Sequence, residues 1–414
     1  MGCGGVRARG LARGYDQRFV ASFSVRFLGC KVSHDDAQQV REALVRDGHV
    51  ERADAADIAI VNGCCVTHEA VRKSRQAAAR AARTHRRVYV TGCAANLGGA
   101  FAAMPENVTV VARPSEETPT FVAGDVGAIG CVRAEARLER IRAFVKVQDG
   151  CSFSCSFCVV PLVRGASRSR AADAVLAEVR RRVAQGHREV VLTGINLGCY
   201  RDRAAGYTLA RLIRAAGATP GLARLRLSSI EVNHVNEELV RALRETPTVG
   251  HHLHVPLQSG DERVLRTMAR RYSPDTYLRR LEPLADFNLT SDVIVGFPGE
   301  DERAFERTLA VVEQAGITKV HVFPYSPRPG TETAAQDTVP APVKKERSAR
   351  LRAASHAACV ARWQTKVGRE DIVLVDRPGR GYGDDYCPWL VEGTLGELVR
   401  VRGRAVTDQG VLAA

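Results

Sequence analysis

Three cysteines close together in the chain, Cys151, Cys155 and Cys158, have the residue type and the spacing of an iron–sulfur ligand set. Three thiolates within eight residues could bind three irons of a four-iron, four-sulfur cluster and leave the fourth iron open to a further ligand. A zinc knuckle is the alternative, but structural zinc sites use four ligands in short pairs, and the next histidine is His187. The spacing and the number of ligands therefore favour a cluster with one open iron.

Three further cysteines, Cys30, Cys64 and Cys93, lie far apart in the chain but share one local setting. Each closes a short, apolar, β-branched run that predicts a buried parallel strand, and the separations of 34 and 29 residues are about one strand plus one helix. The carboxyl ends of such strands meet at one edge of a sheet. The alternative is three unrelated buried cysteines, since free cysteine packs as a small hydrophobe. Their repetition at one place in three units favours a second cluster site.

The first triplet has the form CxxxCxΦC, with the aromatic Phe157 before the last cysteine. This form resembles the signature of the radical S-adenosylmethionine superfamily. In that superfamily the amino and carboxylate groups of S-adenosylmethionine chelate the open iron, and an electron from the cluster cleaves the sulfonium to release a 5′-deoxyadenosyl radical. The resemblance therefore implies a [4Fe-4S] cluster and S-adenosyl-L-methionine as cofactors.

Two cysteine triplets in this order resemble the methylthiotransferases, radical enzymes that replace a C–H bond by C–S–CH3. The resemblance covers about residues 21 to 365. Among the subfamilies, the run Leu-Gly-Cys-Lys-Val at 28–32 and the Arg-Ser-Arg at 168–170 are most similar to threonylcarbamoyladenosine tRNA methylthiotransferase. The Pro-Lys-Asn of the ribosomal-protein branch and the Gln-Met-Asn of the isopentenyladenosine branch do not follow Cys30. Further matching stretches are 61–67, 90–95, 164–170, 191–195, 227–231, 252–260, 291–300 and 321–325.

The resemblance assigns a role to each triplet. The cysteines of the CxxxCxΦC loop would bind the cluster that generates the radical. Cys30, Cys64 and Cys93 would bind a second [4Fe-4S] cluster, which carries the sulfur to be inserted. Cys65 stands beside Cys64, where the family usually has Thr, so we predict that Cys65 is a bystander. No catalytic residue beyond the clusters is expected.

Five other residues are implied in binding S-adenosylmethionine. Phe157 would lie against the adenine, and backbone groups of Thr193 and Gly194 would reach the ammonium group. An ordinary tight turn is the alternative for Thr193 and Gly194. Ser229 and Glu231 end the third predicted strand of the central domain and would reach the ribose or the methionyl part.

The implied reaction is methylthiolation of carbon 2 of N6-threonylcarbamoyladenosine next to the anticodon. Its partners would be the tRNA anticodon stem-loop and an electron donor such as flavodoxin or ferredoxin. Three alternatives stay open: methylthiolation of isopentenyladenosine in tRNA, methylthiolation of a ribosomal-protein aspartate, and a non-catalytic RNA-binding iron–sulfur protein.

Charge and composition suit such a partner. The chain has 60 basic and 46 acidic residues, a net charge of +14, and 53 of its basic residues are Arg. This excess favours a polyanion, although either dense basic stretch, at 72–87 or at 344–352, could also be a solvated helix face. No apolar run approaches the ~18 residues of a membrane span. Twelve cysteines without an export signal predict metal binding in a reducing cytoplasm.

The order of predicted elements indicates an α/β chain in five segments. We expect a disordered extension at 1–20, a doubly wound parallel α/β domain at 21–130, a radical S-adenosylmethionine domain at 137–340, a basic helix at 343–366 and a TRAM-like RNA-binding domain at 367–414. The third segment should form a partial (β/α)6 TIM barrel and the last a small antiparallel β-barrel. The six barrel strands are predicted at 143–148, 189–194, 224–230, 252–257, 290–296 and 319–325.

Overall fold

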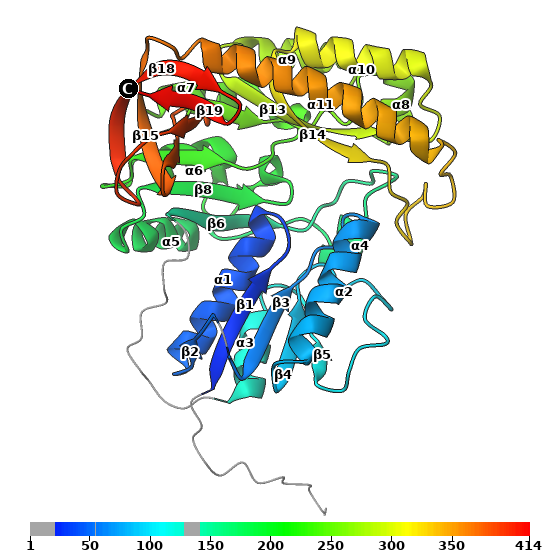
Figure 1. Cartoon of the computed structure of the whole chain (residues 1–414), viewed down its shortest axis with the longest axis vertical. Helices are drawn as coiled ribbons and strands as arrows, with labels where there is room; N and C mark the ends of the chain where they lie inside the picture. Colours follow the sequence, from blue (N-terminus) through cyan, green and yellow to red (C-terminus); the bar gives the residue numbers. More distant parts are fainter. Residues whose placement is uncertain (1–20, 54, 128–140) are drawn as a thin grey trace, which may run out of the picture.

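The computed structural model describes residues 21–53, 55–127 and 141–414. The extension expected at 1–20 lies outside the described residues, as does most of the expected boundary between the first two domains, at 128–140. Figure 1 shows an N-terminal unit in blue and cyan below a larger unit in green to orange, with the C-terminal strands in red beside the larger unit.

Five parallel strands form the sheet of the N-terminal unit, in the order β2-β1-β3-β4-β5. Helices α1 and α3 cover one face, where Phe23, Leu44 and Val122 share an apolar cluster, and α2 covers the other face, where Ala77 packs near Val61. Helices on both faces of a parallel sheet make a doubly wound arrangement. The elements are β1 (Ser22–Phe27), α1 (Lys31–Arg46), β2 (Val50–Glu51), β3 (Ile58–Asn62), α2 (His68–Ala82), β4 (Arg87–Thr91), β5 (Val108–Val110) and α3 (Thr118–Val126).

Six parallel strands form the larger unit and follow their order in the sequence. β6, β8 and β11 make one paired set, and β12, β13 and β14 make another. Isolated parallel bridges, from Leu225 to Val249 and from Ser229 to His254, join the two sets into one open barrel. The strands are β6 (Arg142–Asp149), β8 (Glu189–Gly194), β11 (Arg224–Leu227), β12 (His252–His254), β13 (Asn288–Val295) and β14 (Ile317–Pro324), with the short β7 (Arg168–Ser169) antiparallel on β6.

All six predicted strands are present, but two are shorter than the sequence suggests. β11 ends at Leu227 instead of residue 230, and β12 ends at His254 instead of residue 257. Past these points only isolated bridges join neighbouring strands. In β12 the next residues include Pro256, which has no N–H to give to a sheet ladder.

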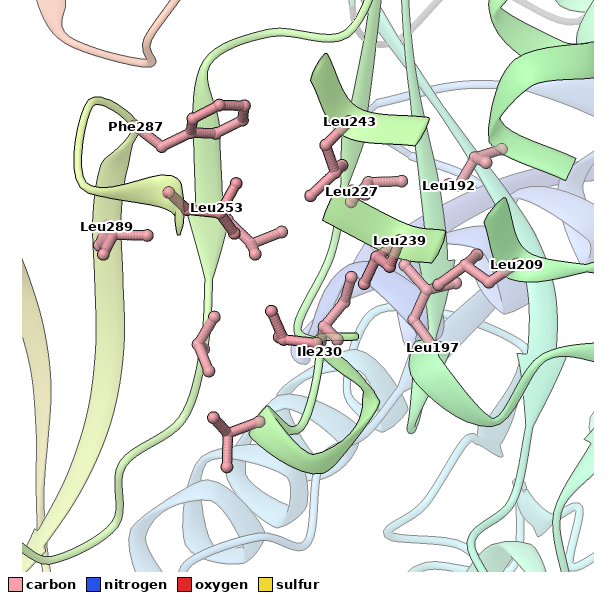
Figure 2. Packing of buried hydrophobic residues seen from close by; sticks show 14 of the residues in the cluster. Leu192, Leu197, Leu209, Leu227, Ile230, Leu239, Leu243, Leu253, Phe287 and Leu289 are labelled. Carbon is pink, nitrogen blue, oxygen red and sulfur yellow. The ribbon is translucent and has the colours of Figure 1, made fainter. Parts of the chain in front are cut away.

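Helices cover the outer face of the six strands and enclose the largest apolar core. Figure 2 shows Leu192, Leu227 and Leu253 from the strands near Leu209 and Leu239 from the helices. Burial of each such side chain contributes about 1.5–3 kcal/mol. The helical elements are α4 (Val160–Arg164), α5 (Ala172–Ala184), η1 (Leu197–Cys199), α6 (Leu209–Gly217), η2 (Val232–His234), α7 (Glu237–Glu245), α8 (Glu262–Thr267), α9 (Pro274–Leu281), η3 (Glu282–Leu284) and α10 (Glu302–Gln314); β9 (Arg201–Asp202) and β10 (Tyr207–Thr208) form a separate hairpin.

The C-terminal strands close into a small barrel after the long helix α11 (Ala341–Gln364). The barrel was expected to be antiparallel, but β17 and β19 pair in parallel, because closure brings the last strand beside β17 as well as β18. Trp389 is 1% exposed at its centre. The strands are β15 (Glu370–Arg377), β16 (Arg380–Tyr382), β17 (Pro388–Leu390), β18 (Leu398–Thr407) and β19 (Gly410–Ala413), ordered β15-β16-β17-β19-β18.

The small barrel is held against the first strands of the larger unit by buried arginines. Arg142 forms an ion pair with Asp376 at 2.7 Å, and Arg226 donates to the carbonyl oxygens of Gly383 and Asp384 at 2.7 and 2.8 Å. No helix among the described residues is long and apolar enough to cross a bilayer.

Candidate functional site

The loop triad consists of Cys151, Cys155 and Cys158, which follow the carboxyl end of β6 as predicted. Gly150 makes the turn with φ +66°, and a Cβ there would lie 2.1 Å from the carbonyl oxygen of Ala166, so no other residue fits. The loop folds back on itself, because Phe153 N–H donates to Cys151 Sγ at 3.4 Å and Cys158 N–H to Cys155 O at 3.0 Å. These local contacts gather the three thiols within one turn of chain.

The electrostatics of the loop triad favour a positively charged occupant. Burial, with smaller contributions from the neighbouring thiolates, raises the pKa of Cys151 and raises that of Cys158 to about 12. The guanidinium of Arg270 donates to Cys155 Sγ at 3.5 Å and lies 3.5 Å from Glu231. Metal binding requires deprotonated thiols and removes this mutual repulsion, so the donor set fits an iron cluster better than three free thiols.

The strand-end triad consists of Cys30, Cys64 and Cys93, which the structure brings to one edge of the N-terminal sheet. Cys30 follows β1 and begins α1, Cys64 follows β3, and Cys93 follows β4. Burial, with smaller contributions from the nearby thiols of Cys93 and Cys30, raises the pKa of Cys64 to about 11. The prediction that three distant strands deliver their cysteines to one place agrees with this geometry.

Cys65 is closer to the strand-end triad than the sequence suggests. Its side chain is fully buried, and a hydrogen bond between the thiols of Cys65 and Cys93 raises the pKa of Cys65 and lowers that of Cys93. Cys64 is only partly buried, and its N–H donates to Ser74 Oγ at 3.1 Å. Both neighbours in the sequence therefore lie near Cys93, which the alternation of a strand does not predict.

Arg164 connects the two triads. Its Nε donates to Cys93 Sγ at 2.9 Å, and Nη1 donates to Asp149 Oδ1 at 2.9 Å, one residue before the glycine turn of the loop triad. Nη2 donates to Asp36 of α1 at 2.8 Å. Arg164 ends α4, so a single buried side chain ties the strand-end triad to the end of β6. A cavity of about 410 Å³ lies beside it, lined by Cys93, Asp149 and Arg164 among others.

The charges around Arg164 form one buried network in the joint between the two units. Lys146 pairs with Asp36 and with Asp149, the latter at 3.2 Å. Burial raises the pKa of Asp149, but Arg164 and Lys146 outweigh burial and hold it well below its usual range. Burial raises the pKa of Asp35 to about 6, because Lys146 offsets only part of the desolvation.

Comparison with known proteins identifies the family. Residues 145–312 match the model described as "Radical SAM superfamily", and residues 22–112 match the model described as "Uncharacterized protein family UPF0004". The chain is 32% identical to threonylcarbamoyladenosine tRNA methylthiotransferase MtaB of Thermotoga maritima, over 94% of this chain and 96% of that protein. It is 35% identical to tRNA-2-methylthio-N(6)-dimethylallyladenosine synthase of Sorangium cellulosum, over 87% of this chain and 83% of that protein.

The chain belongs to the tRNA methylthiotransferases of the radical S-adenosylmethionine superfamily. Membership implies S-adenosylmethionine and a [4Fe-4S] cluster as cofactors. A solved structure agrees on the fold alone: TsrM from Kitasatospora setae, a radical S-adenosylmethionine methyltransferase with cobalamin and a [4Fe-4S] cluster bound, has a TM-score of 0.55 at 13% identity, over 76% of this chain and 77% of that chain.

The five residues predicted to bind S-adenosylmethionine in this methylthiotransferase differ in their burial and in their hydrogen bonds. Glu231 is buried beside Arg270, and Ser229 is partly exposed at its bridge to His254. Thr193 is fully buried and its Oγ1 has no partner among the described residues. The N–H of Gly194 is already used, because it donates to Ser228 Oγ at 3.2 Å.

Phe157, the fifth predicted residue, packs its ring edge-on to Phe297 with 6.0 Å between centroids and belongs to an apolar cluster with Met268 and Tyr325. Asn196, which the sequence did not single out, lies beside Cys151. Its side chain hydrogen-bonds to Cys151 and lowers the pKa of that thiol, and its Oδ1 is buried without a partner among the described residues. An unsatisfied buried oxygen next to a ligand cysteine suits a polar cofactor.

Three arginines around the cysteines of the methylthiotransferase, Arg164, Arg270 and Arg328, were not predicted as site residues. Arg164 lies in a stretch that matches the family, but the match gave it no role. Arg270 follows α8 and Arg328 follows β14, so each is far in sequence from the thiols it approaches. Tertiary folding brings these arginines close to the thiols, and the spacing of residues in the sequence does not reveal such neighbours.

Proposed function

We propose that this methylthiotransferase attaches a methylthio group to carbon 2 of N6-threonylcarbamoyladenosine next to the anticodon of cytoplasmic tRNA, using two [4Fe-4S] clusters. The observation that carries the proposal is the pair of three-cysteine sites joined through Arg164, which contacts Cys93 of one site and Asp149 beside the other. Radical activation and sulfur insertion are separate tasks, so two neighbouring ligand sets suit a reaction that needs both.

The loop triad would hold the cluster that, with S-adenosylmethionine, supplies a 5′-deoxyadenosyl radical. Around it Arg270 places a positive charge beside Cys155, and the apolar cluster that includes Phe157 excludes water from that side. Glu231 and Ser229 would bind polar parts of the cofactor. The strand-end triad would hold the second cluster, and Arg164 would orient Cys93 by its hydrogen bond to the thiolate.

Three arginines in the interior of the open barrel are already paired with carboxylates. Arg142, Arg224 and Arg226 point there, but each has a carboxylate partner, namely Asp376, Asp384 and Glu189. These pairs leave the arginines little charge to offer a substrate. Tyr386 of the small barrel packs against the same arginines, with its ring centroid 5.3 Å from the guanidinium carbon of Arg142 and 4.7 Å from that of Arg226.

Lys31, close to these arginines, has no carboxylate in direct contact among the described residues. It is half-buried next to Cys30, and among residues 21–53, 55–127 and 141–414 it makes no hydrogen bond or ion pair. Its ammonium group lies within electrostatic range of Tyr386, His252 and His321. Threonylcarbamoyl carries a carboxylate and dimethylallyl is apolar, so an ammonium group with no direct ion pair favours the first substituent.

A metal ion is the other occupant that this region suggests, because His254, Asp292 and His321 bring ligand atoms within 4.8 Å of one another. His254 is already held by Thr290 at 2.9 Å and by Asp292 at 3.2 Å. Lys31 nearby disfavours a further cation there. An anionic substituent therefore fits the charges better than a metal ion.

The surface supports binding of RNA. α2 carries Arg72, Arg75 and Arg80 on its exposed side, beside a cavity of about 630 Å³ that is also lined by His68 and Arg328. The small closed barrel after α11 resembles a TRAM domain and would add contacts to the phosphate backbone. A flavodoxin or ferredoxin would supply the electrons.

The test uses reconstituted protein, dithionite and anticodon stem-loop RNA that carries threonylcarbamoyladenosine, dimethylallyladenosine or plain adenosine. Mass analysis of the nucleosides should show a methylthio group on the first RNA. Lys31→Gln should lower kcat/KM for that RNA roughly ten- to a hundredfold and leave a substrate with a neutral threoninamide unchanged. Preference for dimethylallyladenosine would support the runner-up substrate, and 5′-deoxyadenosine without any modified RNA would contradict the function.

A further inference from the structure

Arg328 is a buried cation without a partner. It follows β14, its side chain is 3% exposed, and its Nε and Nη1 atoms are fully shielded from solvent. Within the described parts of the chain neither nitrogen has a hydrogen-bond partner, and no carboxylate pairs with the guanidinium. An unpaired buried charge costs several kcal/mol, so a guanidinium is retained in such a place only when an anion reaches it.

The groups around Arg328 show which anion that is. The guanidinium lies within electrostatic range of the thiols of Cys65 and Cys64, which follow β3, and Arg328 lines one cavity with Leu97 and Gly98, which follow Cys93. The segment before it is fixed to the start of α2, because His68 N–H donates to Ser326 Oγ at 3.3 Å. The chain leaving the sixth barrel strand therefore reaches across to the N-terminal unit and presents a cation to its cysteines.

We propose that Arg328 is a positioning residue whose guanidinium donates hydrogen bonds to the anionic cluster bound by Cys30, Cys64 and Cys93. The inference rests on the proposed function, which places a cluster at that triad. A cluster with three thiolate ligands is an anion overall, and hydrogen bonds to its sulfurs tune its stability and potential. Together with Arg164, which contacts Cys93, Arg328 would let the barrel unit hold the cluster from a second side.

An RNA phosphate is the other anion near Arg328, because the cavity beside it is also lined by Arg72 and Arg75. The structure favours the cluster, since Nε and Nη1 are shielded from solvent and a phosphate at the surface could not reach them without rearrangement. Arg75 is exposed on the same cavity and provides a matched control for the phosphate.

The experiment compares Arg328→Met, Arg328→Lys and Arg75→Met with the wild type, each as apoprotein and after anaerobic reconstitution. In the apoprotein, Arg328→Met removes an unpaired buried charge. In the reconstituted protein, the same change removes a hydrogen-bond donor to the cluster. We therefore expect an unchanged or higher Tm without iron and a lower Tm with iron. The second cluster should lose iron to a chelator roughly ten- to a hundredfold faster, and its reduction potential should become more negative. Arg328→Lys should recover part of both losses.

Other outcomes separate the failures. Equal loss of Tm in the apoprotein and the reconstituted protein would make Arg328 an ordinary structural residue and overturn the inference. Normal iron retention with tRNA affinity lowered as in Arg75→Met would assign Arg328 to a phosphate and also overturn it. If the reconstituted wild type binds only the cluster of the loop triad, the proposed function with two clusters is contradicted. That result does not depend on the Arg328 variants.

Discussion

The two three-cysteine sites are built in opposite ways. The loop triad needs one turn of chain, a glycine at position 150 and a few short-range hydrogen bonds. The strand-end triad needs three parallel strands in register, because β1, β3 and β4 each deliver one cysteine. A local motif can form in many folds, whereas a site assembled from strand ends exists only when the whole sheet has formed.

The two sites also differ in which unit supplies the arginines beside them. The loop triad receives its cation, Arg270, from its own barrel unit. The strand-end triad receives both Arg164 and Arg328 from the barrel unit, across the joint. The N-terminal unit therefore supplies the thiols of its site but depends on its neighbour for the charges that stabilise a cluster there.

The largest effects should come from removing whole triads. Changing Cys151, Cys155 and Cys158 to Ala should abolish cleavage of S-adenosylmethionine and halve the iron content of about eight per chain. Changing Cys30, Cys64 and Cys93 to Ala should also halve the iron content but leave cleavage intact without methylthiolation. Iron analysis and 5′-deoxyadenosine formation check both variants. Retention of eight irons by either one would contradict two separate clusters.

The next effect should come from Arg164, which links the two sites. Arg164→Met leaves Asp36 and Asp149 buried with only Lys146 to compensate them, so unfolding free energy should fall by about 3–5 kcal/mol. Urea unfolding of the apoprotein measures this loss. Arg168→Met is the control, because the side chain of Arg168 is 44% exposed and its pair with Glu116 is a surface pair. Equal loss in both variants would show that the joint does not depend on Arg164.

Sequence alone predicts where the cysteines of the loop triad lie, and in outline where those of the strand-end triad meet, whereas their role as cluster ligands stays a prediction. Apolar runs ending in cysteine predict both the strands and the edge where they meet, and all six barrel strands lie where the alternation of elements puts them. Arg270 and Arg328 could not be predicted, because tertiary packing alone brings Arg270 to Cys155 and Arg328 within electrostatic range of Cys64 and Cys65. The parallel pairing of β17 with β19 depends in the same way on closure of the small barrel.

A smaller effect should appear in how the stability of the N-terminal unit depends on pH. The folded pKa of Asp35 is raised to about 6 from 3.8, so the folded state binds a proton more tightly than the unfolded state does. Its contribution to stability is therefore greatest below pH 4 and is lost as pH rises toward 6. Asp35→Asn should remove this loss and raise the unfolding free energy at pH 7 by about 1–3 kcal/mol.

Asp57 is the control in the same unit, because hydrogen bonds from Ser22 lower its pKa and give the opposite slope. Asp57→Asn should lose stability at neutral pH. Unfolding curves between pH 4 and pH 8 measure both variants. A loss of stability at pH 7 in Asp35→Asn would mean that the carboxylate is needed in its ionised form by Lys146.

The smallest effect should be that of Cys65, and it decides which of two neighbouring thiols completes the strand-end triad. Cys64 is partly exposed and lies near both Cys93 and Cys30, whereas Cys65 is buried and its thiol lies against that of Cys93. A cluster must reach three thiols at once, so Cys64 suits the third ligand and Cys65→Thr should keep iron content and turnover within about twofold of the wild type. Cys64→Ala should lose the second cluster. Reversed outcomes would mean that the chain after β3 presents Cys65 to the cluster instead of Cys64. The cluster would then lie at the more buried of the two thiols.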